Sequence, residues 1–165
     1  MKTKKLVLSA ILLAIGSVLH FITPPVLFGV KPDFLLVMTF VSIYISKDFK
    51  LTLVIGLAAG IIAALTTSFP VGQIPSIFDK LISSLVVFAV FSAMKFNVND
   101  LKMALVNLLG TLVSGVVFLL LGLYMMGQLN VFFESMTVVY ITMPINAILS
   151  VLVYRALTIS ARSFA

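Results

Sequence analysis

The chain is 165 residues long, 62% hydrophobic and only 10% charged, and its mean hydropathy is +1.27. A soluble domain of this length needs far more polar surface, so the composition excludes a soluble protein and indicates an integral membrane protein. With no cysteine and one histidine, the chain has no disulfide framework, and its histidine alone cannot build a metal site. The net charge of +6 does not indicate nucleic-acid binding, because the basic residues lie at the ends of apolar runs.

Six apolar segments follow one another along the chain. They are separated by charged or Pro/Gly-rich stretches and cover about Leu6–Thr23, Pro32–Ile45, Leu51–Thr67, Pro75–Met94, Met103–Met126 and Phe132–Tyr154. Most are long enough to cross a hydrocarbon core as a helix, which takes about 20 residues. The second segment spans only about 21 Å, so the loop Pro24–Lys31 before it is expected to lie below the membrane surface. We expect one all-α domain of six transmembrane helices that covers residues 1–165.

The distribution of basic residues predicts the orientation of these helices. If the N-terminus is inside, all Lys and Arg residues except Lys31 and Lys80 lie on the cytoplasmic side. The positive-inside rule therefore predicts that both termini are cytoplasmic. It also places the sequence KPD at residues 31–33 and the segment Thr66–Lys80 on the same outer face.

The segment Thr66–Lys80, TTSFPVGQIPSIFDK, is the most polar interruption between apolar runs. Irregular backbone and ionisable groups at membrane depth are tolerated only where protein or water satisfies them. If Pro75 begins the fourth helix, Asp79 and Lys80 lie about one turn inside it. Neighbours on a helix point about 100° apart, so we expect these two side chains to find separate partners instead of a tight ion pair with each other.

Two charges of each sign are thus expected near the outer surface, namely Lys31, Asp33, Asp79 and Lys80. A zwitterionic amino acid is the complement of this set: its ammonium group suits Asp79 or Asp33, and its carboxylate suits Lys80 or Lys31. The alternative is that the charges lie at the membrane interface or pair with one another.

Other residues could complete such a site. Four members of the polar segment are expected to line or close the pocket: Thr67, Phe69, Gln73 and Phe78. Asn146 follows Pro144 in the sixth segment, where it either stabilises a proline kink or binds a substrate N–H. His20 is as consistent with helix packing as with a ligand contact. For Glu134, at the start of the sixth segment, an interaction with the helix dipole is favoured.

Small residues spaced four apart form a second pattern. Gly56 and Gly60 in the third segment, and Gly110 and Ser114 in the fifth, favour close helix packing inside the bundle. In the first segment the pattern includes Ala10 and Ala14, which could face either another helix of the bundle or a partner subunit.

Nucleotide-binding and catalytic motifs do not occur in the sequence. Without a G-x-x-x-x-G-K-[ST] loop, the chain cannot hydrolyse ATP by itself, and no catalytic set indicates an intramembrane enzyme. We therefore expect neither enzymatic activity nor a cofactor.

Two motifs carry a resemblance to a known family. The sequence KPD after a Pro-Pro loop, followed by LTTSFPVGQIPSIFDK at residues 65–80, resembles the bacterial tryptophan-transporter (TrpP) family, and the match runs from MKTKKLV to the sixth segment. That family is grouped with the substrate-binding S components of energy-coupling factor (ECF) transporters. The resemblance implies six helices, an occluding outer pocket and L-tryptophan as the ligand. It also implies a transmembrane coupling subunit that Ala10 and Ala14 contact, and two cytoplasmic ATPases.

We interpret the chain as the substrate-binding subunit for L-tryptophan uptake in a bacterial cell membrane. Asp79, Lys80, Lys31 and Asp33 would hold the amino and carboxylate groups, and Asn146 or a backbone carbonyl would accept the indole N–H. Two other interpretations stay open at this point. The chain could be a solitary ion-coupled carrier in which Asp79 titrates, or a non-transporting membrane subunit that anchors partners.

Overall fold

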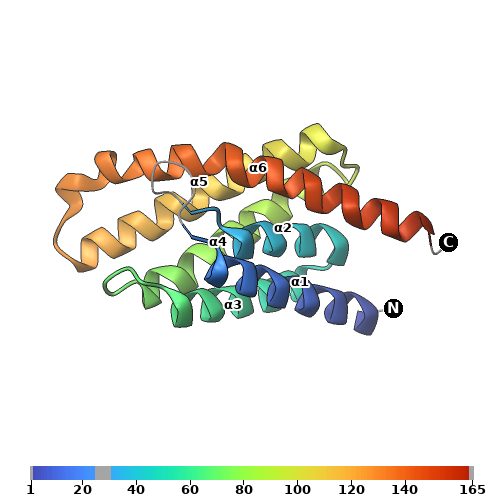
Figure 1. Ribbon diagram of the computed structural model, residues 1–165, viewed down its shortest axis with the longest axis horizontal. Helices are drawn as coiled ribbons and strands as arrows, with labels where there is room; N and C mark the ends of the chain where they lie inside the picture. The colour runs from blue at the N-terminus through green and yellow to red at the C-terminus, as the bar shows by residue number, and fades with distance from the viewer. Residues whose placement is uncertain (1, 25–30, 164–165) are drawn as a thin grey trace.

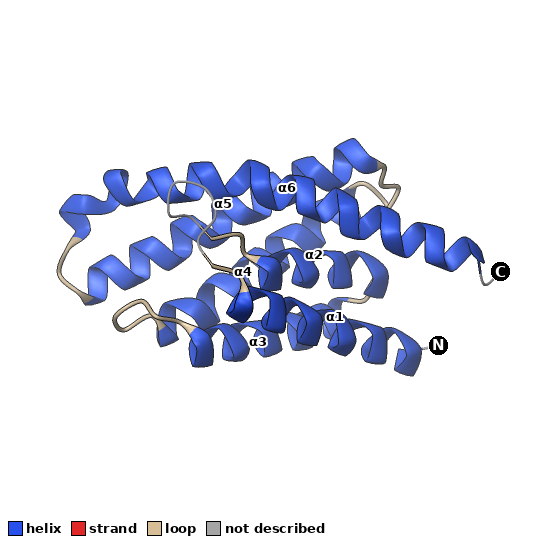
Figure 2. Cartoon of the chain, viewed as in Figure 1, coloured by secondary structure: helices blue, strands red, loops and turns tan. Residues whose placement is uncertain are grey.

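The computed structural model describes residues 2–24 and 31–163, and within them the chain forms six α-helices, one short 3-10 helix and no strand (Figure 2). The elements are α1 (Lys2–Ile22), α2 (Phe34–Ser46), α3 (Phe49–Thr66), α4 (Gln73–Ala93), α5 (Asp100–Met125), η1 (Leu129–Val131) and α6 (Phe132–Ser163). The prediction of an all-α bundle with six helices is therefore confirmed. Most of the loop that we expected below the membrane surface, residues 25–30, lies outside the described residues.

Polar residues set the starts of three helices. The side chains of Asp33, Asp48 and Asn99 each accept a hydrogen bond from the backbone N–H three residues later, at 2.9, 3.1 and 2.9 Å. These caps satisfy donors that a helix N-terminus otherwise leaves free. The fourth helix begins at Gln73 instead of Pro75. The proline is tolerated in that first turn because its missing N–H would have had no partner inside the helix.

The shortest α-helix is the central one. Five helices are long and apolar enough to cross a membrane, whereas α2 has only 13 residues. This short helix contacts each of the other five α-helices, and most of its residues are buried. Its side chains are therefore apolar because they form the core of the bundle, not because they face lipid.

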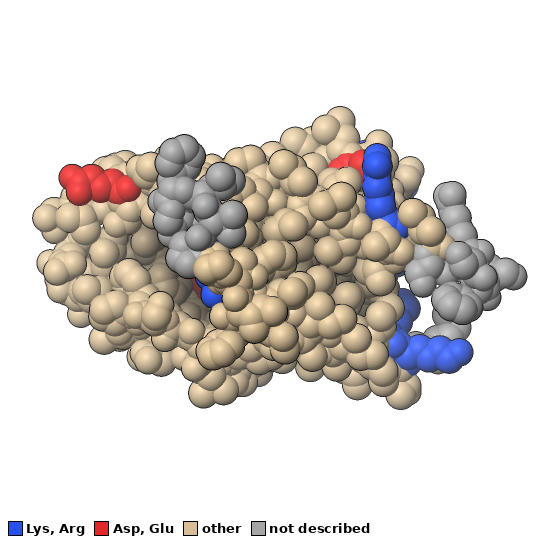
Figure 3. Space-filling model, in the orientation of Figure 1, with Lys and Arg blue, Asp and Glu red and all other residues tan. Residues whose placement is uncertain are grey.

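The helices run up and down along an elongated bundle (Figure 1). The start of α1, the end of α6 and the α2–α3 and α4–α5 connections lie at one end, and the α3–α4 and α5–α6 connections lie at the other. Because α2 begins partway along the bundle, its N-terminal cap Asp33 lies between the two ends of the bundle and not at either end. Basic side chains gather at the end where α1 begins (Figure 3). The cytoplasmic location of that end stays a prediction.

Glycines allow the helices to pack closely, as the sequence predicted. A Cβ atom at Gly60 would lie 2.9 Å from the Ile77 Cα on α4, and one at Gly110 would lie 2.4 Å from the Phe40 ring of α2. Both positions therefore require glycine at the present helix separation. In contrast, Ala10 and Ala14 of α1 are exposed in the described structure.

Candidate functional site

A cavity of about 430 Å³ lies inside the bundle, and all six α-helices contribute to its wall. Its apolar lining consists of Leu35, Leu36, Ala63, Phe69, Gly115, Phe118, Leu119, Val138 and Val139. Its polar lining consists of His20, Lys31, Asp33, Thr67, Ser76, Asp79, Lys80, Thr111, Ser114, Ser135, Thr142 and Asn146. This volume falls within the range of about 300–1,000 Å³ that is typical of small-molecule sites, and the combination of apolar walls with converging polar groups is also typical.

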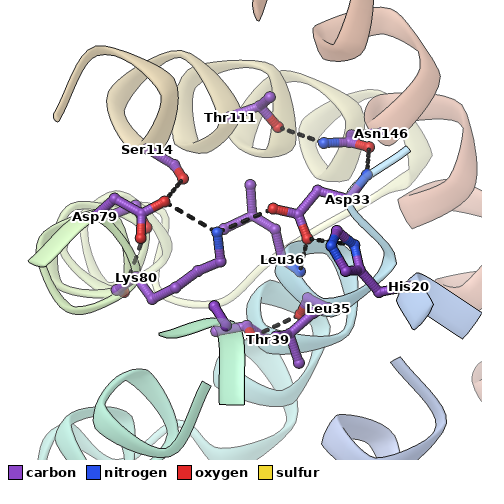
Figure 4. Close-up of polar contacts among 12 residues, drawn as sticks. His20, Asp33, Leu35, Leu36, Thr39, Asp79, Lys80, Thr111, Ser114 and Asn146 are labelled. Atoms are coloured by element: carbon purple, nitrogen blue, oxygen red, sulfur yellow. Dashed lines mark hydrogen bonds and ion pairs between the residues drawn. The ribbon is translucent and has the colours of Figure 1, made fainter. Parts of the chain in front are cut away.

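The centre of the polar lining is the ammonium group of Lys80 (Figure 4). Its Nζ atom lies 2.9 Å from Asp33 Oδ2 and 3.0 Å from Asp79 Oδ2, and the Lys80 and Asp79 side chains are only 6% and 3% exposed. The lysine therefore connects the N-terminal cap of α2 to α4. Among the described residues, no three His, Asp or Glu side chains are grouped so that they could hold a metal ion.

The expectation that Asp79 and Lys80 would not pair with each other is wrong. The two side chains do leave α4 in different directions. The four-carbon stem of Lys80 is nevertheless flexible enough to bring its ammonium group back to the Asp79 carboxylate. Each residue also has a further partner, as expected: Asp79 Oδ2 accepts a hydrogen bond from Ser114 Oγ at 2.6 Å, and Lys80 donates to Asp33.

Asn146 holds Asp33 in place from the opposite side. Its Oδ1 atom accepts a hydrogen bond from the Asp33 backbone N–H at 3.0 Å, and its Nδ2 atom donates to Thr111 Oγ1 at 3.3 Å. The side chain thus connects α6 to α5 and to the start of α2. Both amide atoms thus bond to other elements, and within the described residues neither bonds to a carbonyl of α6. The role of Asn146 at the Pro144 kink stays a prediction.

Several polar groups of the cavity lining have no hydrogen bond within the described part of the chain, and three of them carry or can carry a charge. Asp79 Oδ1 is buried without a partner, and so is His20 Nδ1, whose 3.5 Å separation from Asp33 Oδ1 is within ion-pair range but does not make a hydrogen bond. Lys31 takes part in none of the ion pairs formed by these residues. A buried carboxylate oxygen without a donor is costly, so this arrangement favours a bound molecule that carries a positive charge.

An aromatic wall closes another side of the cavity. The rings of Phe69 and Phe118 meet edge to face with their centroids 5.2 Å apart. The loop before α4 holds Phe69 there: its N–H donates to Thr67 Oγ1 at 3.2 Å, and its carbonyl accepts from the Gly72 N–H at 2.9 Å. On α5, Gly122 leaves room for this ring, since a Cβ atom would lie 3.0 Å from it. The wall offers a surface for an aromatic group.

Most residues that the sequence predicted for the site line this cavity, namely Lys31, Asp33, Thr67, Phe69, Asp79, Lys80 and Asn146. Gln73 and Phe78 do not line it, and both side chains are exposed. Phe78 precedes Asp79 by one residue and therefore points about 100° away around α4, towards the outside of the bundle.

The comparison with known families decides what kind of protein this is. The family model described as "Tryptophan transporter TrpP" matches residues 2–162. The chain belongs to the TrpP tryptophan transporter family. Three curated relatives are each named "Probable tryptophan transport protein". No solved structure matches the chain significantly.

The TrpP relatives come from bacteria and cover most of the chain. The protein from Clostridium acetobutylicum is 40% identical over 98% of this chain and 96% of its own length. The protein from Bacillus subtilis is 45% identical over 77% of this chain and 74% of its own length, and the one from Clostridium perfringens is 37% identical over 97% and 94%. Together with the apolar helices, these matches show a multi-pass bacterial membrane protein.

Sequence reasoning missed several polar and aromatic residues of this TrpP cavity. On α5 these are Thr111, Ser114 and Phe118, and on α6 they include Thr142. Ser114 was interpreted only as a small packing residue. The helical spacing of these residues could have indicated a shared polar face, because positions 111, 114 and 118 lie on one face of a helix, as do 135, 142 and 146.

Proposed function

We propose that the chain is the substrate-binding membrane subunit of an uptake system for L-tryptophan. The single observation that carries the proposal is the buried Asp79 Oδ1 atom, which has no partner among the described residues and borders a cavity of amino-acid size. Membership of the TrpP family and the names of the relatives support tryptophan as the amino acid.

The free groups of the cavity match the two ends of a zwitterion. In the proposed binding mode the substrate ammonium donates to Asp79 Oδ1, and the substrate carboxylate accepts from Lys31. Lys80 is a weaker candidate for the carboxylate than the sequence indicated, because two of its three N–H donors are already used by Asp33 and Asp79. Its third donor is left for the ligand.

The aromatic wall and the amide of Asn146 complete this binding mode. The indole ring would pack against Phe69 and Phe118, where edge-to-face contacts favour an aromatic group over an aliphatic one. A carbonyl oxygen has two lone pairs, and Asn146 Oδ1 uses one of them for the Asp33 N–H. The second lone pair can accept the indole N–H. Thr67 would act by keeping Phe69 in position.

We further propose that a coupling subunit and two cytoplasmic ATPases energise the uptake, with both termini in the cytoplasm. The exposed positions of Ala10 and Ala14 on α1 support a docking face for another membrane helix. Uptake by vesicles tests this proposal. Transport that requires the ATPases and survives collapse of the proton and sodium gradients supports it, and transport by the chain alone that stops with the gradient favours a solitary carrier.

Equilibrium binding of L-tryptophan to the purified protein tests the site. Asp79→Asn and Lys31→Met are each expected to weaken binding about 10- to 100-fold, since each loses one charge-assisted hydrogen bond. Glu134→Gln and Lys50→Met remove the same kinds of charge at exposed positions outside the cavity and are expected to bind like the wild type. Unchanged affinity in Asp79→Asn would remove that carboxylate from the site.

A further inference from the structure

The ammonium group of Lys80 occupies a place with the features of a cation site. Oxygen atoms from two carboxylates converge on it, Asp33 Oδ2 at 2.9 Å and Asp79 Oδ2 at 3.0 Å (Figure 4). The Ser114 hydroxyl lies beside them, 2.6 Å from the same Asp79 oxygen. The site thus draws its two oxygens from the cap of α2 and from α4, while Ser114 on α5 fixes the Asp79 oxygen in place. It is held together by a cation that belongs to the chain itself.

The two carboxylates need that positive charge. The Asp79 and Asp33 side chains are 3% and 22% exposed, so water screens their mutual repulsion only weakly. His20 approaches the other oxygen of Asp33, and Lys31 forms no ion pair with either aspartate. Within the described structure, Lys80 is therefore the cation that neutralises both groups.

We propose that Lys80 is a tethered counter-cation: it fills a cation site formed by Asp33 and Asp79, with Asp79 held in place by Ser114, so that the cavity assembles without a bound inorganic ion. Removal of the lysine side chain then creates a site for a monovalent cation of about ammonium size, such as K⁺ or an alkylammonium ion. The distances from nitrogen to oxygen, 2.9 and 3.0 Å, define that size.

This arrangement has a consequence for transport. A cation that is covalently attached to α4 cannot be released on the other side of the membrane. The site between Asp33 and Asp79 therefore cannot couple substrate uptake to an ion gradient while Lys80 fills it. Lys80 would be a positioning residue, since it keeps Asp79 in place for the ligand while its own charge is shared between the two carboxylates.

The first test uses stability and needs no ligand. The melting temperatures of the wild type, Lys80→Ala and Asp33→Asn/Lys80→Ala are compared at equal ionic strength in choline, potassium and ethylammonium chloride. Wild type is expected to melt at the same temperature in all three salts. Lys80→Ala is expected to melt about 10 °C lower in choline, whose ion is too large for the site, and to recover most of this loss with potassium or ethylammonium.

The double variant is the matched control. It loses the same aliphatic stem as Lys80→Ala but removes one of the two negative charges, and asparagine at position 33 can still cap α2. It is expected to melt above Lys80→Ala in choline but below the wild type, because only Asp79 is left without a counter-charge, and to respond less to the cation. If Lys80→Ala cannot be purified at all, recovery of the folded double variant supports the proposal, and failure of both variants to fold overturns it.

The second test measures L-tryptophan binding in the same three salts, and it rests on the proposed function. Lys80→Ala is expected to bind at least about 10-fold more weakly in choline than in ethylammonium, whereas wild-type binding is independent of the salt. If the wild type binds no tryptophan in any salt, the proposed function fails while the melting temperatures still test the cation site. A melting temperature of Lys80→Ala that equals that of the wild type in choline, or that no cation raises, would overturn the tethered counter-cation.

Discussion

The two halves of this bundle are built differently. Towards the end where α1 begins, the interior is filled by apolar side chains such as Phe40, Phe91 and Met103, all fully buried. Towards the end where α5 meets α6, the same helices surround a cavity that contains Asp79 and Lys80. We call these regions the packed half and the hollow half.

Their polar groups also bond differently. In the packed half, several buried hydroxyl groups bond to carbonyl groups of their own helix, as in Ser46 to Ile43 at 3.0 Å and Ser150 to Ala147 at 2.7 Å. In the hollow half, several bonds of Lys80, Ser114 and Asn146 cross between elements, as in Lys80 to Asp33. Bonds inside one helix only satisfy a buried group, whereas bonds between helices fix how the elements meet around the cavity. The packed half therefore supplies stability, and the hollow half is the region that we propose binds the ligand.

The largest predicted effect is a loss of stability when a core side chain of the packed half is removed. Phe40→Ala is expected to lower the free energy of unfolding by about 3–5 kcal/mol, because it leaves a void at the centre of the packed half. Thermal or denaturant unfolding of the purified protein measures this loss. Phe133→Ala is the control, since that side chain is 84% exposed and its removal opens no internal void. Equal losses in the two variants would contradict the assignment of the core.

A smaller effect is expected where Gly110 meets Phe40. A methyl group at Gly110 would lie 2.4 Å from the Phe40 ring, so Gly110→Ala is expected to cost about 1–3 kcal/mol of stability through overpacking. Adding Phe40→Leu to Gly110→Ala provides room for the methyl group and is expected to recover part of the loss. If the losses of stability caused by Gly110→Ala and Phe40→Leu simply add in the double variant, the close contact between the two positions does not cause the loss in Gly110→Ala.

The smallest effect is predicted in the hollow half. Phe118→Leu keeps an apolar side chain on α5 but removes the edge-to-face partner of Phe69, and it is expected to weaken tryptophan binding by about 0.5–1.5 kcal/mol. Stability should change little, because the ring lines a cavity and is only partly buried. Binding of tryptophan and leucine to both proteins measures the effect. A loss of stability without a loss of affinity would place Phe118 with the packed half.

The sequence predicts this architecture well where the signals are local. Hydropathy separates the six helices, and Asp33 and Asp48 cap helices close to the expected starts. The polar segment before α4 also contributes Thr67 and Phe69 to the cavity, as expected. These features depend on residues that are near one another in the chain.

Contacts between distant elements were not predictable in the same way. Lys80 and Asp33 are 47 residues apart, and Ser114 and Asp79 are 35 residues apart, so their meeting depends on how the helices pack. The rule that neighbouring side chains diverge on a helix also failed for Asp79 and Lys80, because it describes the Cβ direction and not the reach of a long side chain.

The central claim is that the free oxygen of Asp79 receives the ammonium group of tryptophan. The most direct measurement compares binding of L-tryptophan and of indole-3-propionate, which lacks that ammonium, to the wild type and to Asp79→Asn. We predict that the wild type prefers tryptophan by at least about 10-fold and that Asp79→Asn loses most of this preference. An equal preference in both proteins would contradict the claim.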